Sequence, residues 1–348
     1  MTGAAAAGPS CDAPSPDGSP PWVRVVIVNY NGGAWLQRAV DALAVQSDHA
    51  FAAVVVDNAS TDGSAERLVL PDRRFSLIHA GSNLGFAAAN NLAARDCPLP
   101  FVATLNPDAR AAPDWLAALR RAVRRYPDAA MFGSTQIDAL DPSRLDGCGD
   151  VMSIFGLPWR GGHGHPVTAA PATDGEVFAP CAAAALYRTD AFAAAGGFDE
   201  SFFCYLEDVD LGFRLRLAGH RCIQVRDAVV YHVGSAISGR TSDFTLFHSY
   251  RNRLWLVAKC MPFPLVLLTL PLHVLATLYL LLRTRRLQNT AAALRGLWAG
   301  FRGLRIALKA RRRVQAGRRA GNVAIARALS WRVADLRSRA IHLRADRS

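Results

Sequence analysis

Strand-like runs alternate with helical patterns through the first third of the chain, and this alternation limits the fold more than any other feature. Four apolar runs read WVRVVIVN, FAAVVVD, FSLIH and FVATL. Each ends in a polar turn, and apolar residues at helical spacing follow three of them. Strands that alternate with helices predict βαβ units and a mostly parallel sheet. We therefore expect an α/β fold with helices flanking the sheet.

Polar side chains stand at the ends of three of these strand-like runs. They are Asn29, Asp57 and Asp108. One Asn or Asp in such a place is a common loop cap, but ligands of parallel sheets bind at the carboxyl ends of the strands. The three residues together predict a binding site at that edge.

Charge is distributed unevenly along the 348 residues. Residues 283–348 contain 18 Arg and Lys against 2 Asp and Glu, a net charge of +16, whereas residues 1–282 have a net charge of −4. A basic tail of this kind meets nucleic acid or an anionic membrane. No nucleic-acid-binding motif accompanies the tail, so we expect an anionic membrane surface and no nucleic acid.

Cysteine usage and the N-terminus indicate the compartment. The seven cysteines are scattered, odd in number and form no CxxC, which predicts reduced thiols in the cytoplasm. No basic segment followed by a long apolar run begins the chain, so we expect no signal peptide. Residues 1–21 are rich in Ala, Gly, Ser and Pro and are predicted to be a disordered lead-in.

The tail itself divides into two parts. Residues 261–282 contain no Asp, Glu, Lys or Arg and are just long enough to span a bilayer, but three prolines interrupt them and arginines flank both ends. A membrane-embedded or re-entrant element is therefore favoured over a simple span. The apolar residues of 294–308 and the basic residues beside them predict an interfacial helix, with a core-packing helix as the alternative.

Between the strand–helix units and the tail lies an acidic cluster. The segment FFCYLEDVDLGFRLRLAGH, residues 202–220, places Glu207, Asp208 and Asp210 ahead of an apolar helical pattern. Acidic residues suit the first turn of a helix, so capping competes with a catalytic interpretation. Before this cluster, residues 141–178 show no clear period and are predicted to be a long loop that includes a flexible HxH.

Five ordered motifs resemble inverting glycosyltransferases of family two, which have the GT-A fold. They are VVIVNYNGG, VVVDNASTDGS, NLGFAAANN, LNPDA and GGFDESFFCYLEDVDLGFRLRLAGHRC with VVYHVGS. The likeness covers about residues 22–260 and is greater to bacterial rhamnosyltransferase-type members that build cell-surface polysaccharides. It implies a GT-A domain at 22–260 and a membrane-associating basic helical tail at 261–348.

The resemblance also implies the donor site. Asp57 would accept a hydrogen bond from a pyrimidine base, and Asn29 and Tyr30 would line the same nucleotide pocket. Asn83 and Gly85 resemble the family's NxG turn. Asn106 stands where many relatives carry the first Asp of Asp-x-Asp, which leaves Asp108, with His232, to hold Mg²⁺ or Mn²⁺ beside the diphosphate.

The same resemblance implies the chemistry. Asp208 matches the catalytic base, Glu207 would assist it or bind the acceptor, and Asp210 would raise the negative potential or cap the helix. Aromatic side chains, at Phe202, Phe203, Tyr205 and Trp159, would stack on sugars.

Several alternatives stay open for the substrate and the function. The expected reaction moves a sugar, rhamnose from dTDP-rhamnose in the favoured case, to a lipid-linked or polysaccharide acceptor at the cytoplasmic face of the inner membrane. Other nucleotide sugars remain open, such as UDP-galactofuranose or a UDP-N-acetylhexosamine, and so does a non-catalytic assembly protein that binds nucleotide sugars. A nucleotidyltransferase would need a Lys or Arg in the first turn, which NYNGGAWLQ lacks.

Overall fold

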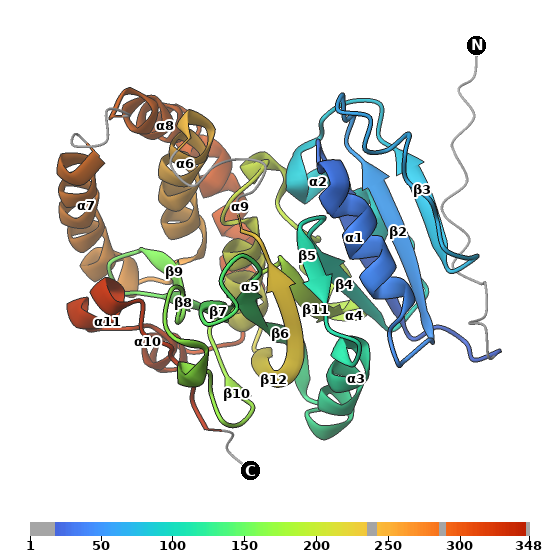
Figure 1. Cartoon of the computed structure of the whole chain (residues 1–348). Helices are drawn as coiled ribbons and strands as arrows, with labels where there is room; N and C mark the ends of the chain where they lie inside the picture. The colour runs from blue at the N-terminus through green and yellow to red at the C-terminus, as the bar shows by residue number, and fades with distance from the viewer. Residues whose placement is uncertain (1–17, 235–241, 285–289, 346–348) are drawn as a thin grey trace.

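A ten-stranded sheet forms the centre of the molecule in this computed structural model, which describes residues 18–234, 242–284 and 290–345 (Figure 1). The strand order is β10-β12-β6-β11-β4-β1-β2-β3, with β5 paired to β12 and β7 paired to β6. The strands are β1 Val23–Asn29, β2 Phe51–Asp57, β3 Phe75–His79, β4 Phe101–Leu105, β5 Ala109–Ala111, β6 Ala129–Asp138, β7 Leu145–Cys148, β10 Gly175–Glu176, β11 Ala184–Arg188 and β12 Arg221–His232.

Most of the long strands run parallel, as expected. β3, β2, β1 and β4 form one parallel block, β12 runs parallel to β6, and β11 is antiparallel between β4 and β6. Asn29 lies directly opposite Asp57 in the register of β1 and β2. The α/β prediction is confirmed, and the polar ends of neighbouring strands do meet at one edge.

Helices cover both faces of the parallel block because alternate strand residues point to opposite sides. Val25 and Ile27 share a buried cluster with α1 (Gly33–Ala44) and α3 (Trp115–Arg125). Val26 and Val28 share another with α2 (Gly85–Ala94). Both faces of each strand are therefore apolar, which explains the unbroken hydrophobic runs in the sequence.

The second half of the chain is mainly helical and gathers away from β3, at the other end of the sheet (Figure 1). The further α-helices are α4 Thr189–Ala194, α5 Glu207–Leu217, α6 Asp243–Cys260, α7 Leu265–Thr284, α8 Thr290–Arg302, α9 Leu304–Ala316, α10 Asn322–Ala328 and α11 Val333–Ser338. Short 3₁₀ turns occur at Val167–Ala169 and Glu200–Phe202. One buried cluster joins side chains of α5, α6, α9 and α10, so these helices pack as a unit.

The last residues return to the body of the molecule. Ser330 bridges to Ser153, and Arg344 bridges to Glu176 of β10. Ile325 and Leu329 are fully or almost fully buried in the helical core. The predicted boundary between residues 260 and 261 stays a prediction, but part of the tail packs against the residues before it.

Two expectations about local structure were wrong. Residues 141–178 are not one long loop, because β7 pairs with β6 and a two-stranded sheet forms from β8 (Asp150–Met152) and β9 (Pro158–Arg160). The helical pattern around 294–308 is not one helix either. It breaks at Gly303, where a Cβ atom would lie 2.3 Å from the indole of Trp255.

Helix α7 is unusual in its exposure. Its segment Leu265–Leu282 has a mean hydropathy of 2.3 but is only 17% buried, and it is the one helix in the described residues that is long and apolar enough to cross a membrane. The predicted lead-in at 1–21 falls mostly outside the described residues, which begin at residue 18.

Candidate active site

Asn29 and Asp57 form a hydrogen-bonded pair at the ends of β1 and β2. The Asn29 side-chain amide donates to Asp57 Oδ1 at 3.1 Å and also to the hydroxyls of Ser60 and Ser64, both at 2.9 Å. The backbone N–H of Ser60 donates to Asp57 Oδ2 at 3.3 Å. Asp57 is 5% exposed. Tyr30 and Asn58, which follow the two paired residues in the chain, line a large cavity.

The predicted NxG turn forms at the start of α2. Asn83 Oδ1 accepts hydrogen bonds from the Gly85 backbone N–H and the Asn58 side chain, both at 3.0 Å. Gly85 has φ +81°, and a Cβ atom there would lie 2.6 Å from both the ring and the carbonyl oxygen of Phe203. Only glycine fits this close approach, because both the conformation and the space exclude a larger side chain.

A chain of polar contacts connects β5, β12 and β7. His232 Nε2 lies 3.2 Å from Asp108 Oδ1 and 3.3 Å from the Asn106 side-chain amide, while its Nδ1 lies 2.7 Å from Asp146 Oδ2. Arg160 pairs with the same Asp146. The structure therefore brings together three residues that the sequence predicted, and adds two that it did not.

Hydrogen bonds and charge determine the ionisation of this chain. Burial opposes the charged form of Asp146, but the charge of Arg160 and the hydrogen bonds of His163 and His232 outweigh it and hold its pKa far below the usual range. Burial likewise opposes an imidazolium at His232, yet its contacts with Asp108 and Asp146 raise its pKa. His163 of the HxH is thus part of this polar network.

Three carboxyl groups surround the start of α5, but their environments differ. Burial raises the pKa of Asp208, while hydrogen bonds from the backbone N–H groups of Ala182, at 3.1 Å, and Val209, at 2.8 Å, limit the rise. Burial and the charge of Asp208 hold the pKa values of Glu207 and Asp150 well above their ordinary range. Backbone N–H groups and the charge of Arg160 therefore favour the carboxylate form of Asp208, against the effect of burial.

Asp210 was expected to cap the helix or to add negative charge beside Asp208. It does neither. Its fully buried carboxylate accepts hydrogen bonds from Arg214 Nε at 2.7 Å and Lys259 Nζ at 2.9 Å. The two cations neutralise it, and Lys259 connects α6 to α5. The acidic group next to Asp208 is instead Asp150, whose carboxylate oxygen lies within 4.8 Å of that of Asp208.

The turn before Asp208 has an uncommon backbone. Phe203, Tyr205 and Leu206 have φ values of +63°, +71° and +67°. The side-chain amide of Asn252, which is fully buried, donates to the carbonyl oxygens of residues 202, 204 and 205 at 3.0, 2.9 and 2.7 Å. Helix α6 thereby stabilises a strained turn that positions the start of α5.

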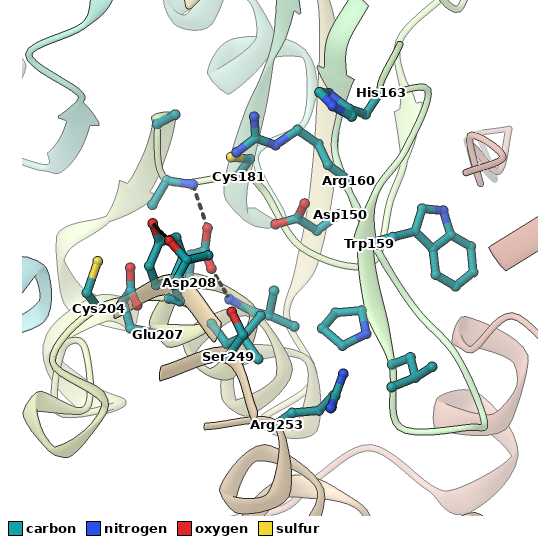
Figure 2. Close-up of a pocket in the computed structure, with 18 of the residues that line it drawn as sticks. Asp150, Trp159, Arg160, His163, Cys181, Cys204, Glu207, Asp208, Ser249 and Arg253 are labelled. Atoms are coloured by element: carbon teal, nitrogen blue, oxygen red, sulfur yellow. Dashed lines mark hydrogen bonds between the residues drawn. The ribbon is translucent and has the colours of Figure 1, made fainter. Parts of the chain in front are cut away.

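A cavity of about 1310 Å³ connects these groups. It extends from Tyr30 and Asp108 past Asp208 to residues of α6, α7 and α11. Figure 2 shows Asp150, Cys181, Glu207 and Asp208 around it. Of the predicted sugar-stacking aromatics, three line the cavity, but Phe202 is 1% exposed within the helical core, so that prediction was wrong for Phe202.

Comparisons with known proteins identify the family. A model described as glycosyl transferase family 2 matches residues 24–193. The N-acetylglucosaminyl-diphospho-decaprenol L-rhamnosyltransferase of Mycobacterium tuberculosis is 31% identical over 243 residues, which are 62% of this chain and 77% of that protein. The chain belongs to glycosyl transferase family 2.

Solved structures support the fold of this glycosyltransferase. A mannosyltransferase of Pyrobaculum calidifontis, solved with GDP-Man and Mn²⁺, is 20% identical with a TM-score of 0.50, and the match covers 88% of each chain. GalNAc-T7, solved with UDP, GalNAc and Mn²⁺, is 16% identical with a TM-score of 0.53, over 66% of this chain and 47% of that one. The GT-A prediction is confirmed.

The residues at the β5 and β12 ends fit the divalent cation that this family implies. Asp108 offers a carboxylate and His232 an imidazole, ligands that suit Mn²⁺, and Asp146 contacts the other ring nitrogen of His232 and so orients the ring. Asp150, Cys181 and Asp208 form another cluster. Burial raises the pKa of the Cys181 thiol to about 12, so this cluster offers a protonated sulfur, a poor ligand for a hard ion.

Sequence reasoning missed three polar residues of the glycosyltransferase cavity. Asp146, Asp150 and Arg160 line it and lie in the segment that has no clear period. The short sequence CGD at residues 148–150 lies in that segment and matches no known motif. Strand pairing with β6 brings the segment to the cavity.

Proposed function

We propose that this glycosyltransferase transfers a sugar from a nucleoside-diphosphate donor with inversion, and that Asp208 is the general base. One observation carries the proposal. Of the carboxyl groups at the start of α5, Glu207 and Asp150 are buried, whereas Asp208 is half-buried at the cavity and accepts hydrogen bonds from two backbone N–H groups. A carboxylate that such donors hold in place at a cavity can accept a proton from an acceptor hydroxyl.

The reaction requires one bond to form as another breaks. The acceptor hydroxyl loses its proton to Asp208, its oxygen bonds to the anomeric carbon, and the nucleoside diphosphate leaves from the opposite face. Asn29, Tyr30, Asp57, Asn83, Gly85 and Asn106 are the proposed nucleotide-sugar residues. Asp108 and His232 would hold Mg²⁺ or Mn²⁺, which when bound stabilises negative charge on the leaving diphosphate. Glu207 binds the acceptor in this scheme.

The mycobacterial relative supports a proposal for the donor and the acceptor. That protein is named as an L-rhamnosyltransferase whose acceptor is a diphospho-decaprenol carrying N-acetylglucosamine. We propose dTDP-rhamnose as the donor and a lipid-linked glycan as the acceptor, in cell-surface glycan synthesis. A UDP-sugar donor is the alternative, because identity of 31% supports the family more strongly than the sugar.

A membrane location agrees with a lipid-linked acceptor. Helix α7 exposes large apolar residues, among them Leu267, Leu275 and Leu282, each at least 61% exposed. The basic residues that follow suit an anionic surface. We propose that residues 22–260 form the transfer domain and that residues 261–348 place it on the cytoplasmic face of the inner membrane, peripherally or with α7 re-entrant.

The test compares substitutions with different expected defects. Asp208→Asn keeps the shape but removes the proton acceptor, so turnover should fall by about 10²–10⁴-fold while nucleotide affinity and Tm change little. Asp57→Ala should weaken nucleotide binding first. Asp227→Asn, an exposed control, should match the wild type. EDTA should abolish transfer, and Mn²⁺ or Mg²⁺ should restore it.

The outcomes separate the parts of the proposal. Near-normal turnover of Asp208→Asn would assign only a structural role to Asp208 and leave Glu207 as the next base. Full activity in EDTA, with metal shown to be absent, would remove Asp108 and His232 from a metal site. A panel of dTDP- and UDP-sugars with one acceptor identifies the donor.

A further inference from the structure

The cavity continues beyond Asp208 into a region that the proposed chemistry does not use. Its far wall consists of apolar residues on one side of α7, namely Leu272, Leu275, Ala276, Tyr279 and Leu280. Arg253 and Ser249 of α6 lie between that wall and the carboxyl groups, because α6 packs against both α5 and α7. The region therefore combines a cation with a long apolar surface.

Arg253 is a buried cation whose hydrogen-bonding capacity is largely unused. Its side chain is 8% exposed, and neither Nε nor Nη2 has a hydrogen-bond partner in the described residues. The guanidinium stacks over the ring of Tyr250 at 4.4 Å, and Figure 2 shows it extending from α6 into the cavity. A buried unpaired charge is costly, so such a group is suited to an anionic ligand.

The donor diphosphate does not account for Arg253. The metal residues Asp108 and His232 connect through Asp146 to Arg160, which already supplies a cation on that side. Figure 2 shows Arg160 and His163 on one side of Asp208 and Arg253 on the opposite side. Arg253 is therefore placed to meet the acceptor, not the leaving group.

We propose that Arg253 binds the phosphate of a lipid-linked acceptor and that the α7 wall receives the first part of its hydrocarbon chain. The inference rests on the proposed function. A sugar–diphosphate–lipid has its sugar, its anion and its chain in one order. The cavity lining includes Asp208 of α5, Arg253 of α6 and apolar residues of α7, and α6 packs against both of the other helices. The planar guanidinium binds phosphate oxygens in pairs.

Kinetics of single variants test the phosphate contact. The assay uses the full chain, a nucleotide sugar and a prenyl-diphosphate-linked sugar in detergent. Arg253→Gln should raise the acceptor KM at least tenfold, with donor KM and the slow hydrolysis of the donor by water within twofold of wild type. Arg253→Lys, which keeps the charge without the fork, should be intermediate. Arg121→Gln, on the exposed surface of α3, is the control and should match the wild type.

The results that would overturn the contact are specific. An unchanged acceptor KM, or a donor KM that rises as much as the acceptor KM, would show that Arg253 does not serve the acceptor phosphate. Circular dichroism and Tm check that Arg253→Gln is folded, and if it is not, the Arg253→Lys values decide between these outcomes.

Direct binding separates the lipid from a free phosphate and separates this inference from the proposed function. Farnesyl diphosphate should bind at least tenfold more tightly than inorganic diphosphate, and Leu275→Asn should weaken only the former. Equal affinities would overturn the role of the α7 wall. Arg253-dependent binding of farnesyl diphosphate without transfer from any nucleotide sugar would refute the proposed function and keep the inference. Transfer that is insensitive to Arg253→Gln would do the reverse.

Discussion

Replacement of Asn252 by alanine should uncouple the turn before Asp208 from helix α6. The Asn252 side-chain amide donates hydrogen bonds to the carbonyl oxygens of Cys204 and Tyr205, at 2.9 and 2.7 Å. The carbonyl oxygen of Phe202 would keep a hydrogen bond from Arg251 at 2.7 Å. The substitution Asn252→Ala therefore removes the side-chain donor from two carbonyl groups at the start of the catalytic helix.

The magnitude follows from those two carbonyl groups and from the strained residues beside them. A buried carbonyl without a partner costs about 1–3 kcal/mol, so two cost about 2–6 kcal/mol, and entry of water moves the value toward the lower end. In the native turn, Tyr205 and Leu206 have φ values that cost about 1–3 kcal/mol each. Without the clamp these residues should relax, displace Asp208 and lower turnover by about 10²-fold.

The assay measures stability, nucleotide affinity and turnover on the same preparations. Asn252→Ala should lower the free energy of unfolding and kcat and should change nucleotide affinity less. The proposed base-binding pair, Asn29 and Asp57, lies on β1 and β2, and Gly85 is the proposed nucleotide residue that packs against Phe203 of the turn. Arg251→Ala is the graded comparison. It removes donors to the carbonyl oxygens of Ser201 and Phe202, and Phe202 keeps Asn252, so the effect should be smaller. A stability change below about 0.5 kcal/mol with normal turnover in Asn252→Ala would refute the clamp.

Three further predictions concern pH, packing and the membrane. Because burial raises the pKa of Asp208, kcat/KM should fall at acid pH with an apparent pKa above the ordinary 3.8. Arg160→Met removes a charge that lowers this pKa, so it should move the fall to higher pH, and a fall at or below 3.8 would contradict the reasoning. Gly85→Ala should lower Tm by several degrees and reduce transfer. Gly81 has a similar φ of +75°, but no atom lies within 4 Å of a Cβ placed there, so Gly81→Ala should show only the backbone cost. Equal Tm losses in the two variants would exclude the clash at Gly85. Leu267→Asp should shift the protein from anionic vesicles to the supernatant in co-sedimentation without changing transfer to a soluble acceptor, and unchanged sedimentation would exclude α7 as the contact. Point substitution is preferable to deletion here, because the tail contributes buried core residues.

Local patterns were sufficient for the first half of the fold. An apolar run such as VVIVN specifies a strand buried on both faces, and the end of each parallel strand falls at one edge whatever the rest of the chain does. The sequence therefore predicted that Asn29 and Asp57 would meet, and that Asp108 would lie near them with His232 on a strand. The start of a helix at Glu207 was also readable, since acidic residues precede an apolar helical pattern.

The tertiary structure alone decided the ionisation and the partners of the acidic residues. Three carboxyl groups in sequence, at Glu207, Asp208 and Asp210, look alike, but a pKa depends on burial and on which donors and charges approach from other elements. Lys259 neutralises Asp210 from α6, Ala182 donates to Asp208 from the segment before β11, and Asp150 comes from a short strand with no sequence signal. These contacts join residues far apart in the chain, so no local pattern carries them, and only the folded arrangement distinguishes Asp208 from its acidic neighbours.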